Sequence, residues 1–179
     1  MDDKITAESR EIEFLQMMKG YGISVPLAPL RDMGFFTAPA STKYHGAYAG
    51  GLYDHSKAVA TALCDLSYDC NVVWQRESSP VIIGMFHDLC KTDQYVLKGD
   101  GTYEYRNNTL FSGHGEKSVM LLSTLMQLTE EEVACIRYHM GSFSDDPNER
   151  SAYSRAVHYY PQVLYTHTAD MIASQIRGI

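Results

Sequence analysis

The sequence predicts an all-α helical bundle with one small β-hairpin inserted in it. Three observations predict this class. Apolar residues recur at helical spacing through most of the 179 residues, several segments begin with helix-capping residues, and strand-like alternation is confined to one short stretch. No internal repeat, low-complexity tract or linker-like composition divides the chain. We therefore expect a single domain over residues 1–179.

Each expected element has its own signal. Capping residues or a proline in the first turn mark helix starts, and apolar steps of three and four mark helix interiors. In the first helix, these steps place Ile12, Leu15 and Met18 on the buried face. The first expected elements are a helix capped by Thr6 and ending near Lys19, an irregular loop over 21–51 rich in proline and glycine, and a helix from Leu52 that carries His55.

The central part is expected to contain a helix opened by Ser79 and Pro80 and running to Cys90, and a hairpin that pairs Tyr95–Leu97 with Thr102–Tyr105. The remaining expected elements are a helix over 114–127, a helix capped by Thr129 and ending near Gly141, and helices begun at Pro147 and Pro161.

Composition and charge exclude several classes of protein. The 15 basic and 22 acidic side chains give a net charge of −7, which makes a nucleic-acid partner less favoured than a small molecule. No apolar run approaches the roughly 18 residues of a membrane span, and the first four residues lack the order of a signal peptide. We expect a cytoplasmic protein with no membrane partner. The cysteines form no CxxC pair and are expected to be reduced, buried thiols: Cys64, Cys70, Cys90 and Cys135.

Histidine and aspartate residues recur on different predicted helices. A metal ion inside a helical bundle takes its ligands from several facing helices. Imidazole and carboxylate groups suit Mn, Fe, Co or Ni, and the lack of a thiolate among them argues against a structural zinc site. Each histidine taken alone is equally well explained as a core or helix-end residue, so the hypothesis depends on the whole set: His55, His87, Asp88, His114, His139 and Asp170.

The pair His87 and Asp88 carries the strongest signal, because it directly follows the apolar segment 81–86. A buried carboxylate costs several kcal/mol unless it is protonated, paired or bound to a metal. Metal ligation would satisfy Asp88. A salt bridge to Lys91, three positions further on, or a helix-capping role would satisfy it as well.

The order of His55, His87-Asp88 and Asp170 resembles the HD superfamily of metal-dependent phosphohydrolases. The segment 87–91 is similar to the HDxGK motif of that family, with Cys90 in the glycine position. Segments 111–114 and 137–139 resemble the further histidine motifs of members that hold two metals. The resemblance extends from about residue 35 to residue 174.

Within that superfamily, the stretch from Pro39 to His55 is similar to the start of the HD module in bacterial 3′-to-5′ exoribonucleases. Those enzymes carry an OB-fold ahead of the module, whereas only a short predicted helix precedes it in these 179 residues. Met140 also stands where they often have a second histidine. Together with the acidic composition, these departures argue against a processive nuclease.

The resemblance implies a metal-dependent phosphohydrolase that cleaves a phosphate ester or anhydride of a nucleotide or similar small substrate, with metal-activated water as the nucleophile. It implies one or two divalent first-row ions, Mn, Fe, Co or Ni, with Mg also acceptable. Asp88 would bridge the two ions and Lys91 would neutralise a phosphate oxygen. The implied ligands are His55, His87, Asp88 and Asp170 for one ion, and Asp88, His114 and His139 for the other.

Aromatic residues before the metal helix are candidates for the substrate wall. Tyr44 and His45 are the first choice for this role, while Tyr48 and Tyr53 could stack on a base or its sugar. Packing within the loop is the favoured explanation of Tyr44, Tyr48 and Tyr53. The expected hairpin is either a lid over the site or a plain surface excursion.

Two other functions are consistent with the same residues. The di-iron oxygenases of this superfamily use the same six ligands, although Lys91 in the motif favours a hydrolase. A regulatory module would bind a nucleotide without turning it over, but no position of the ligand set is broken in a way that recommends it. A purely structural helical domain ranks last.

Overall fold

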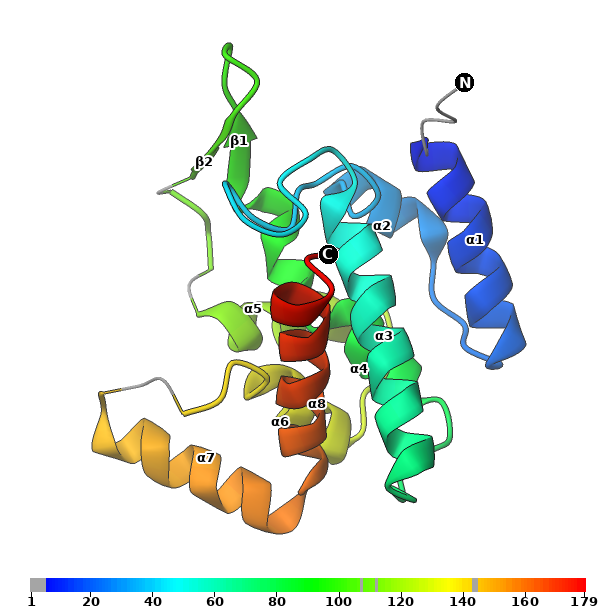
Figure 1. Ribbon diagram of the computed structural model, residues 1–179, viewed down its shortest axis with the longest axis vertical. Coiled ribbons are helices and arrows are strands. Elements are labelled where there is room, and N and C mark those ends of the chain that lie inside the picture. The colour runs from blue at the N-terminus through cyan, green and yellow to red at the C-terminus, as the bar shows by residue number, and fades with distance from the viewer. Residues whose placement is uncertain (1–5, 107, 112, 143–144) are drawn as a thin grey trace.

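The computed structural model describes residues 6–106, 108–111, 113–142 and 145–179. It is mostly helical with one two-stranded antiparallel sheet (Figure 1), which confirms the expected all-α class with a small hairpin. Residue 112, in the segment 111–114 that resembles a histidine motif, and the first four residues, which were considered for a signal peptide, lie outside the described residues. The elements are α1 (Ala7–Gly20), α2 (Leu27–Met33), α3 (Gly51–Asp69), α4 (Ser79–Phe86), the 3₁₀ helix η1 (Leu89–Asp93), β1 (Tyr95–Leu97), β2 (Tyr103–Tyr105), α5 (His114–Ser123), α6 (Glu130–Arg137), α7 (Pro147–Tyr159), α8 (Gln162–Met171) and the π-helix η2 (Ile172–Ile176).

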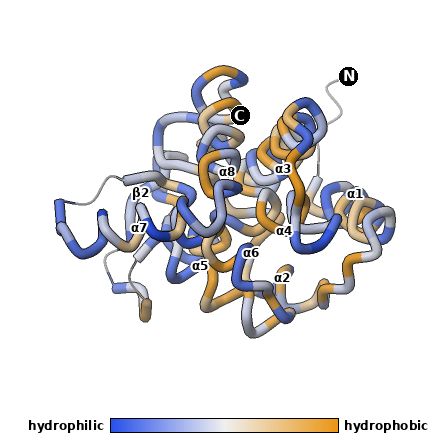
Figure 2. The backbone as a smooth tube through the Cα atoms, turned by 90° about the horizontal axis from the view of Figure 1, so that it is seen from below, coloured by the Kyte–Doolittle hydropathy of each residue, from blue (hydrophilic) through white to orange (hydrophobic). Residues whose placement is uncertain are grey.

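Helix α4 forms the centre of the core. All eight of its residues are buried, and it packs against α3, α6 and α8. Its apolar path lies inside the molecule in Figure 2, whereas α7, which buries none of its residues, lies at the periphery. The helix lies close against α3 at Gly84, where a β-carbon would collide with the backbone of Ala60. A glycine at this position therefore lets α3 and α4 approach closely enough to bring their histidines together.

The buried face of α1 differs from the expected one. Thr6 caps the helix in a capping box with Ser9, as its position predicts. Phe14 and Met18 are buried, but Ile12 is 52% exposed and Leu15 is 46% exposed. Each three-residue step falls about 60° short of a full helical turn, so two steps rotate Ile12 away from the face of Met18. Steps of four, which link Phe14 to Met18, keep closer to one face.

An ion pair fixes α1 against the first turn of α3. Nε and Nη2 of Arg10 donate to the two carboxylate oxygens of Asp54 at 2.9 and 2.8 Å. Both side chains are largely shielded from solvent, 6% and 15% exposed, and the two-pronged geometry is the strong form of this contact. The pair therefore orients the helix that carries His55.

Four expected boundaries are wrong. The helix capped by Thr129 ends at Arg137 rather than near Gly141. The stretch 21–51 is not loop throughout, because it contains α2. The helix before Cys90 ends at Phe86, and the chain tightens after His87 and Asp88 into η1, so Lys91 lies in a 3₁₀ turn. The helix that begins at His114 ends at Ser123 rather than near 127.

A buried carboxylate ties the start of α4 to α6. Ser79 is not the helix cap; its hydroxyl donates to Glu132 Oε1 at 2.8 Å. Arg76 donates to both oxygens of the same carboxylate, at 2.7 and 2.5 Å. Glu132 also completes the capping box of α6 with Thr129, which confirms that predicted helix start. This network fixes the helix that precedes His139.

The hairpin and the cysteines follow the sequence with small departures. Strand β1 pairs with β2 so that Tyr95 lies opposite Tyr105. All four cysteines are free thiols, but only Cys90 and Cys135 are buried; Cys70 is exposed, contrary to expectation. Within the part of the chain that the structure describes, no helix has the length and apolar character needed to cross a membrane.

Candidate metal centre

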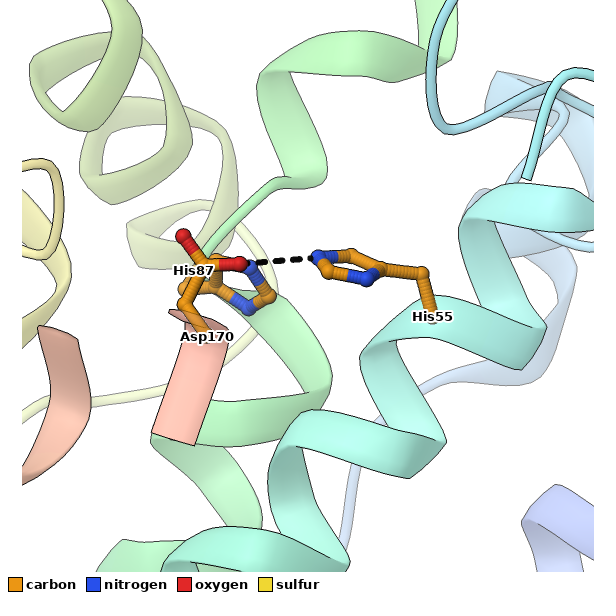
Figure 3. Close-up of side chains that lie close together, drawn as sticks. All are labelled: His55, His87 and Asp170. Atoms are coloured by element: carbon orange, nitrogen blue, oxygen red, sulfur yellow. Dashed lines mark ion pairs between the residues drawn. The ribbon is translucent and has the colours of Figure 1, made fainter. Parts of the chain in front are cut away.

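Five separate segments bring the predicted ligands together in one cluster. Nε2 of His55, on α3, lies 3.2 Å from Oδ1 of Asp170, on α8, and His87 lies beside them at the end of α4 (Figure 3). Asp88 follows His87, His114 begins α5, and His139 lies just after α6. We call this set the His/Asp cluster: His55, His87, Asp88, His114, His139 and Asp170.

Asp88 is at the centre of the cluster. Its Oδ2 lies 3.4 Å from Nε2 of His87 and 3.6 Å from Nε2 of His55. Its Oδ1 lies 2.6 Å from Nε2 of His114 and 3.5 Å from Nε2 of His139. One carboxylate oxygen therefore faces one group of ligands and the other oxygen faces the second group.

Main-chain carbonyls fix the tautomer of three histidines in the cluster. Nδ1 of His87 lies 2.8 Å from the carbonyl oxygen of Gly84, and Nδ1 of His139 lies 2.7 Å from that of Ile136. Nδ1 of His55 lies 2.7 Å from the carbonyl oxygen of Ile179. A carbonyl only accepts, so each Nδ1 carries the proton and each Nε2 presents a lone pair.

These lone pairs have no partner among the described residues. Nε2 of His55, His87 and His139 are buried without a hydrogen bond, and so is Oδ1 of Asp88. Unsatisfied buried polar atoms are costly and uncommon, so four of them gathered in one cluster are consistent with a position for a metal ion. A histidine that ligates through Nε2 normally donates its Nδ1 proton to such a carbonyl. The residues therefore fit a metal ion.

The ligand atoms form overlapping groups in which all atoms lie within 4.8 Å of one another. One group contains His55, His87 and Asp170, and another contains His87, Asp88 and His139. A third contains Asp88, Cys90 and His114. Imidazole and carboxylate donors dominate all three groups, which suits first-row divalent metals.

Lys91 provides the positive charge at the cluster. Its Nζ lies 2.7 Å from Oδ2 of Asp88, so the salt bridge expected from the spacing is formed. Burial alone would raise the pKa of the Asp88 carboxyl, but the charge of Lys91 holds that pKa well below its usual range. Burial would lower the pKa of the Lys91 ammonium, and the Asp88 carboxylate raises it instead. Both groups are therefore charged at neutral pH.

A cleft of about 340 Å³ opens onto the cluster. Asp88, Asp170 and His114 contribute to its floor, next to Lys91. The predicted wall residues Tyr44 and His45 line it, and Tyr44 is 81% exposed. The remaining lining residues are Ala40, Ser41, Gln94, Tyr95, Tyr105, Met140, Met171, Ser174 and Gln175.

His45 is held against the candidate ligand His55. Their ring centroids lie 4.9 Å apart, and Ser41 donates its hydroxyl to the His45 carbonyl at 2.8 Å. Burial, together with the charges of His55 and Lys91, lowers the pKa of His45 to about 4. It therefore presents a neutral imidazole to the cleft at pH 7.

Two of the tyrosines considered for the substrate wall, Tyr53 and Tyr48, are hydrogen-bonded to carboxylates instead. Tyr53 is fully buried in the aromatic core, and its hydroxyl donates to Glu13 at 3.1 Å. Tyr48 donates to Asp54 at 3.0 Å, beside the ion pair with Arg10. The packing alternative is therefore correct for Tyr53, which is absent from the cleft lining.

The sequence did not predict several of the residues that line the cleft. Gln94, Tyr95 and Tyr105 form a side of the cleft at the base of the hairpin. The tyrosine at each end of the predicted hairpin could have suggested this, because paired strand ends lie together. A second hollow of about 230 Å³, lined in part by Arg106 and Lys117, adjoins the cleft across His114.

With this geometry established, the chain was compared with known proteins. A scan against models of known families, a search of curated proteins and a search of solved structures each found no match. Function is therefore inferred from the chemistry of the cluster and its cleft.

Proposed function

We propose that this protein is a metal-dependent phosphohydrolase that cleaves a phosphate ester or anhydride of a nucleotide or similar small molecule. The observation that carries the proposal is the set of three buried imidazoles around Asp88, each with its Nδ1 on a carbonyl and its Nε2 unpartnered. This set supports a metal centre in the arrangement that the HD-like motif order implies, with a helical bundle as its scaffold.

The cluster suits two ions that share Asp88. His55, His87 and Asp170 would hold the first, with Oδ2 of Asp88 facing them. His114 and His139 would hold the second, with Oδ1 of Asp88 facing them. When bound, divalent ions in such a pair lower the pKa of water toward neutrality and neutralise phosphate oxygens.

The positive charge of Lys91 favours a phosphate group as the substrate. Its ammonium lies next to the shared carboxylate and lines the cleft. With Asp88 engaged by metal, the ammonium is available to bind a non-bridging phosphate oxygen and to stabilise the charge that develops there. An oxygenase or a purely structural metal site has no comparable use for a buried cation at this position.

The cleft indicates a small substrate. Its volume of about 340 Å³ lies at the lower end of the roughly 300–1,000 Å³ typical of small-molecule sites. Tyr95 and Tyr105 line it opposite the metal ligands and offer flat surfaces on which a base could stack. The net charge of −7 favours a mononucleotide over a nucleic acid.

The test is hydrolysis by purified protein loaded in turn with Mn, Fe, Co, Ni or Mg. Bis-p-nitrophenyl phosphate and p-nitrophenyl phosphate report diesterase and monoesterase activity, and a nucleotide panel follows. We expect metal-dependent turnover that chelator abolishes and that is lost in His55→Gln. The matched control, His158→Gln, changes an exposed histidine on α7 and should retain activity.

Two results would overturn the proposal. The first is the absence of metal-dependent hydrolysis of any substrate by protein that demonstrably holds metal. The second is a mixed-valent di-iron signal in anaerobically purified protein that consumes oxygen but releases no phosphate or alcohol product, which would assign the centre to an oxygenase.

A further inference from the structure

His114 differs from the other histidines of the cluster in what its Nδ1 faces. At His55, His87 and His139 the neighbour is a main-chain carbonyl. At His114 it is the side chain of Cys90, with Sγ 3.2 Å from Nδ1. A thiol can either donate or accept a hydrogen bond, whereas a carbonyl can only accept.

The thiol therefore sets which nitrogen of His114 is available. If Sγ–H donates to Nδ1, then Nε2 carries the proton and points it at Oδ1 of Asp88, 2.6 Å away. If Nδ1–H donates to Sγ, then Nε2 is free to bind metal. In this second pattern the thiol proton turns to Oε1 of Gln94, which lies 3.9 Å from Sγ.

Cys90 is held firmly enough to act in this way. It lies in η1, is 1% exposed, and donates its main-chain N–H to Oγ of Ser118 on α5 at 3.0 Å. The link to Ser118 also joins Cys90 to the helix that begins with His114.

An unpartnered nitrogen of His139 and the oxygen of Asp88 beside it mark a ligand position on the same side of the cluster. Nε2 of His139 is buried without a hydrogen bond and lies 3.5 Å from Oδ1 of Asp88, the same oxygen that Nε2 of His114 faces at 2.6 Å. With Nε2 of His114 they would complete the second metal position. At this position, Nδ1 of His139 is fixed by the carbonyl of Ile136, whereas Nδ1 of His114 faces the thiol of Cys90.

We propose that Cys90 is a positioning residue for His114, and that binding of the second ion depends on its thiol while binding of the first ion does not. This inference rests on the proposed metal centre. It makes the two halves of the centre unequal: the half with His55, His87 and Asp170 is set by the main chain, and the half with His114 is set by a side chain.

The test is a Mn²⁺ titration followed by the electron paramagnetic resonance signal of the free ion, which gives stoichiometry and affinity without an activity assay. The variants are Cys90→Ala, which removes the hydrogen-bonding group, and Cys90→Ser, which keeps one. Cys135→Ala, a buried cysteine on α6, is the matched control. Optical spectra of the Co²⁺-loaded protein test whether sulfur binds the metal directly.

We expect the wild type to bind two ions. Cys90→Ala should weaken the second by about 10–100-fold, the usual effect of removing a group that orients a ligand, and leave the first unchanged. Cys90→Ser should recover most of the loss, Cys135→Ala should resemble the wild type, and the Co²⁺ spectrum should lack a thiolate charge-transfer band.

Four results would overturn the inference: equal weakening of both ions in Cys90→Ala, no weakening in either Cys90 variant, a thiolate-to-cobalt band, or a wild type that binds one ion only. Rapid alkylation of Cys90 by iodoacetamide at neutral pH would also do so, because it would indicate a nucleophile. A wild type that binds no ion at all removes the proposed function with it. If the wild type shows metal-dependent hydrolysis and Cys90→Ala binds both ions as the wild type does, the inference about Cys90 is wrong and the proposed function stands.

Discussion

The carboxylate of Asp170 on α8 lies 3.2 Å from Nε2 of His55 on α3, so two helices far apart in the sequence place two candidate ligands side by side. Burial alone would raise the pKa of Asp170, but the His55 and His87 imidazoles lower it below its ordinary value. The carboxylate is therefore ionised, the form that the proposed first ion requires.

Asp170→Asn should weaken the first ion by more than about 100-fold, beyond the typical loss from an orienting group, because an anionic ligand becomes a neutral one of the same shape. The measurement is the same Mn²⁺ titration, with thermal unfolding in chelator to show that the metal-free fold is retained. Asp65→Asn, which changes an exposed carboxylate on α3, serves as the control. Unchanged affinity in Asp170→Asn would remove this residue from the ligand set.

Lys91→Met should separate metal binding from turnover. The variant keeps the length of the side chain but removes the cation beside Asp88. We expect retained Mn²⁺ stoichiometry and a fall in kcat of about 10²–10³-fold, the usual effect of losing one group that stabilises transition-state charge. Lys98→Met, on the hairpin, should show wild-type kcat. If Lys91→Met loses metal and leaves kcat per bound ion unchanged, Lys91 supports the ligands rather than the phosphate.

Gly84→Ala should destabilise the protein through the contact of α4 with α3. The added methyl group has no room against the backbone of Ala60, so the helices must separate. Overpacking of this kind costs about 1–3 kcal/mol in the free energy of unfolding, measured by urea denaturation. Because His55 and His87 lie on these two helices, the metal affinity should fall as well. The control is Gly99→Ala on the hairpin, where a β-carbon would meet nothing within 4 Å.

The metal-free protein should lose stability as the pH falls from about 6.5 to about 4. His45 has a pKa near 4 in the folded protein, below the value of about 6.5 in an unfolded chain. In this window the unfolded state binds more protons than the folded state, so the free energy of unfolding rises with pH. His45→Gln should flatten this dependence, measured by urea denaturation at fixed ionic strength. The charged groups that face His45 are His55, Lys91, Asp88 and Asp170, and an equally steep curve in His45→Gln would transfer the effect to them.

The sequence was most informative where one local rule decides the structure. Thr6 and Thr129 begin helices because each satisfies free N–H groups through a capping box, and the hairpin forms where the alternation predicts it. The six ligand positions were chosen because buried polar residues on apolar helices need a common explanation. The structure brings all six together, which their spacing alone could not establish.

Features that depend on tertiary contact were missed. Ile12 reads as a core residue, yet α1 turns Phe14 and Met18 inward, because those side chains pack against the core. Helix α2 lies inside a stretch whose prolines and glycines suggested only loop. The contact between Cys90 and His114 joins two elements, and no spacing rule relates them.

The carbonyl groups that orient His55, His87 and His139 belong to the main chain at Ile179, Gly84 and Ile136. Any amino acid would supply the same oxygen, so a mutational scan that exchanges only side chains leaves these three anchors in place. At Gly84 and Ile136 the contribution would become measurable by replacing the amide linkage itself, for example with a backbone ester, which weakens the carbonyl as an acceptor without altering a single side chain.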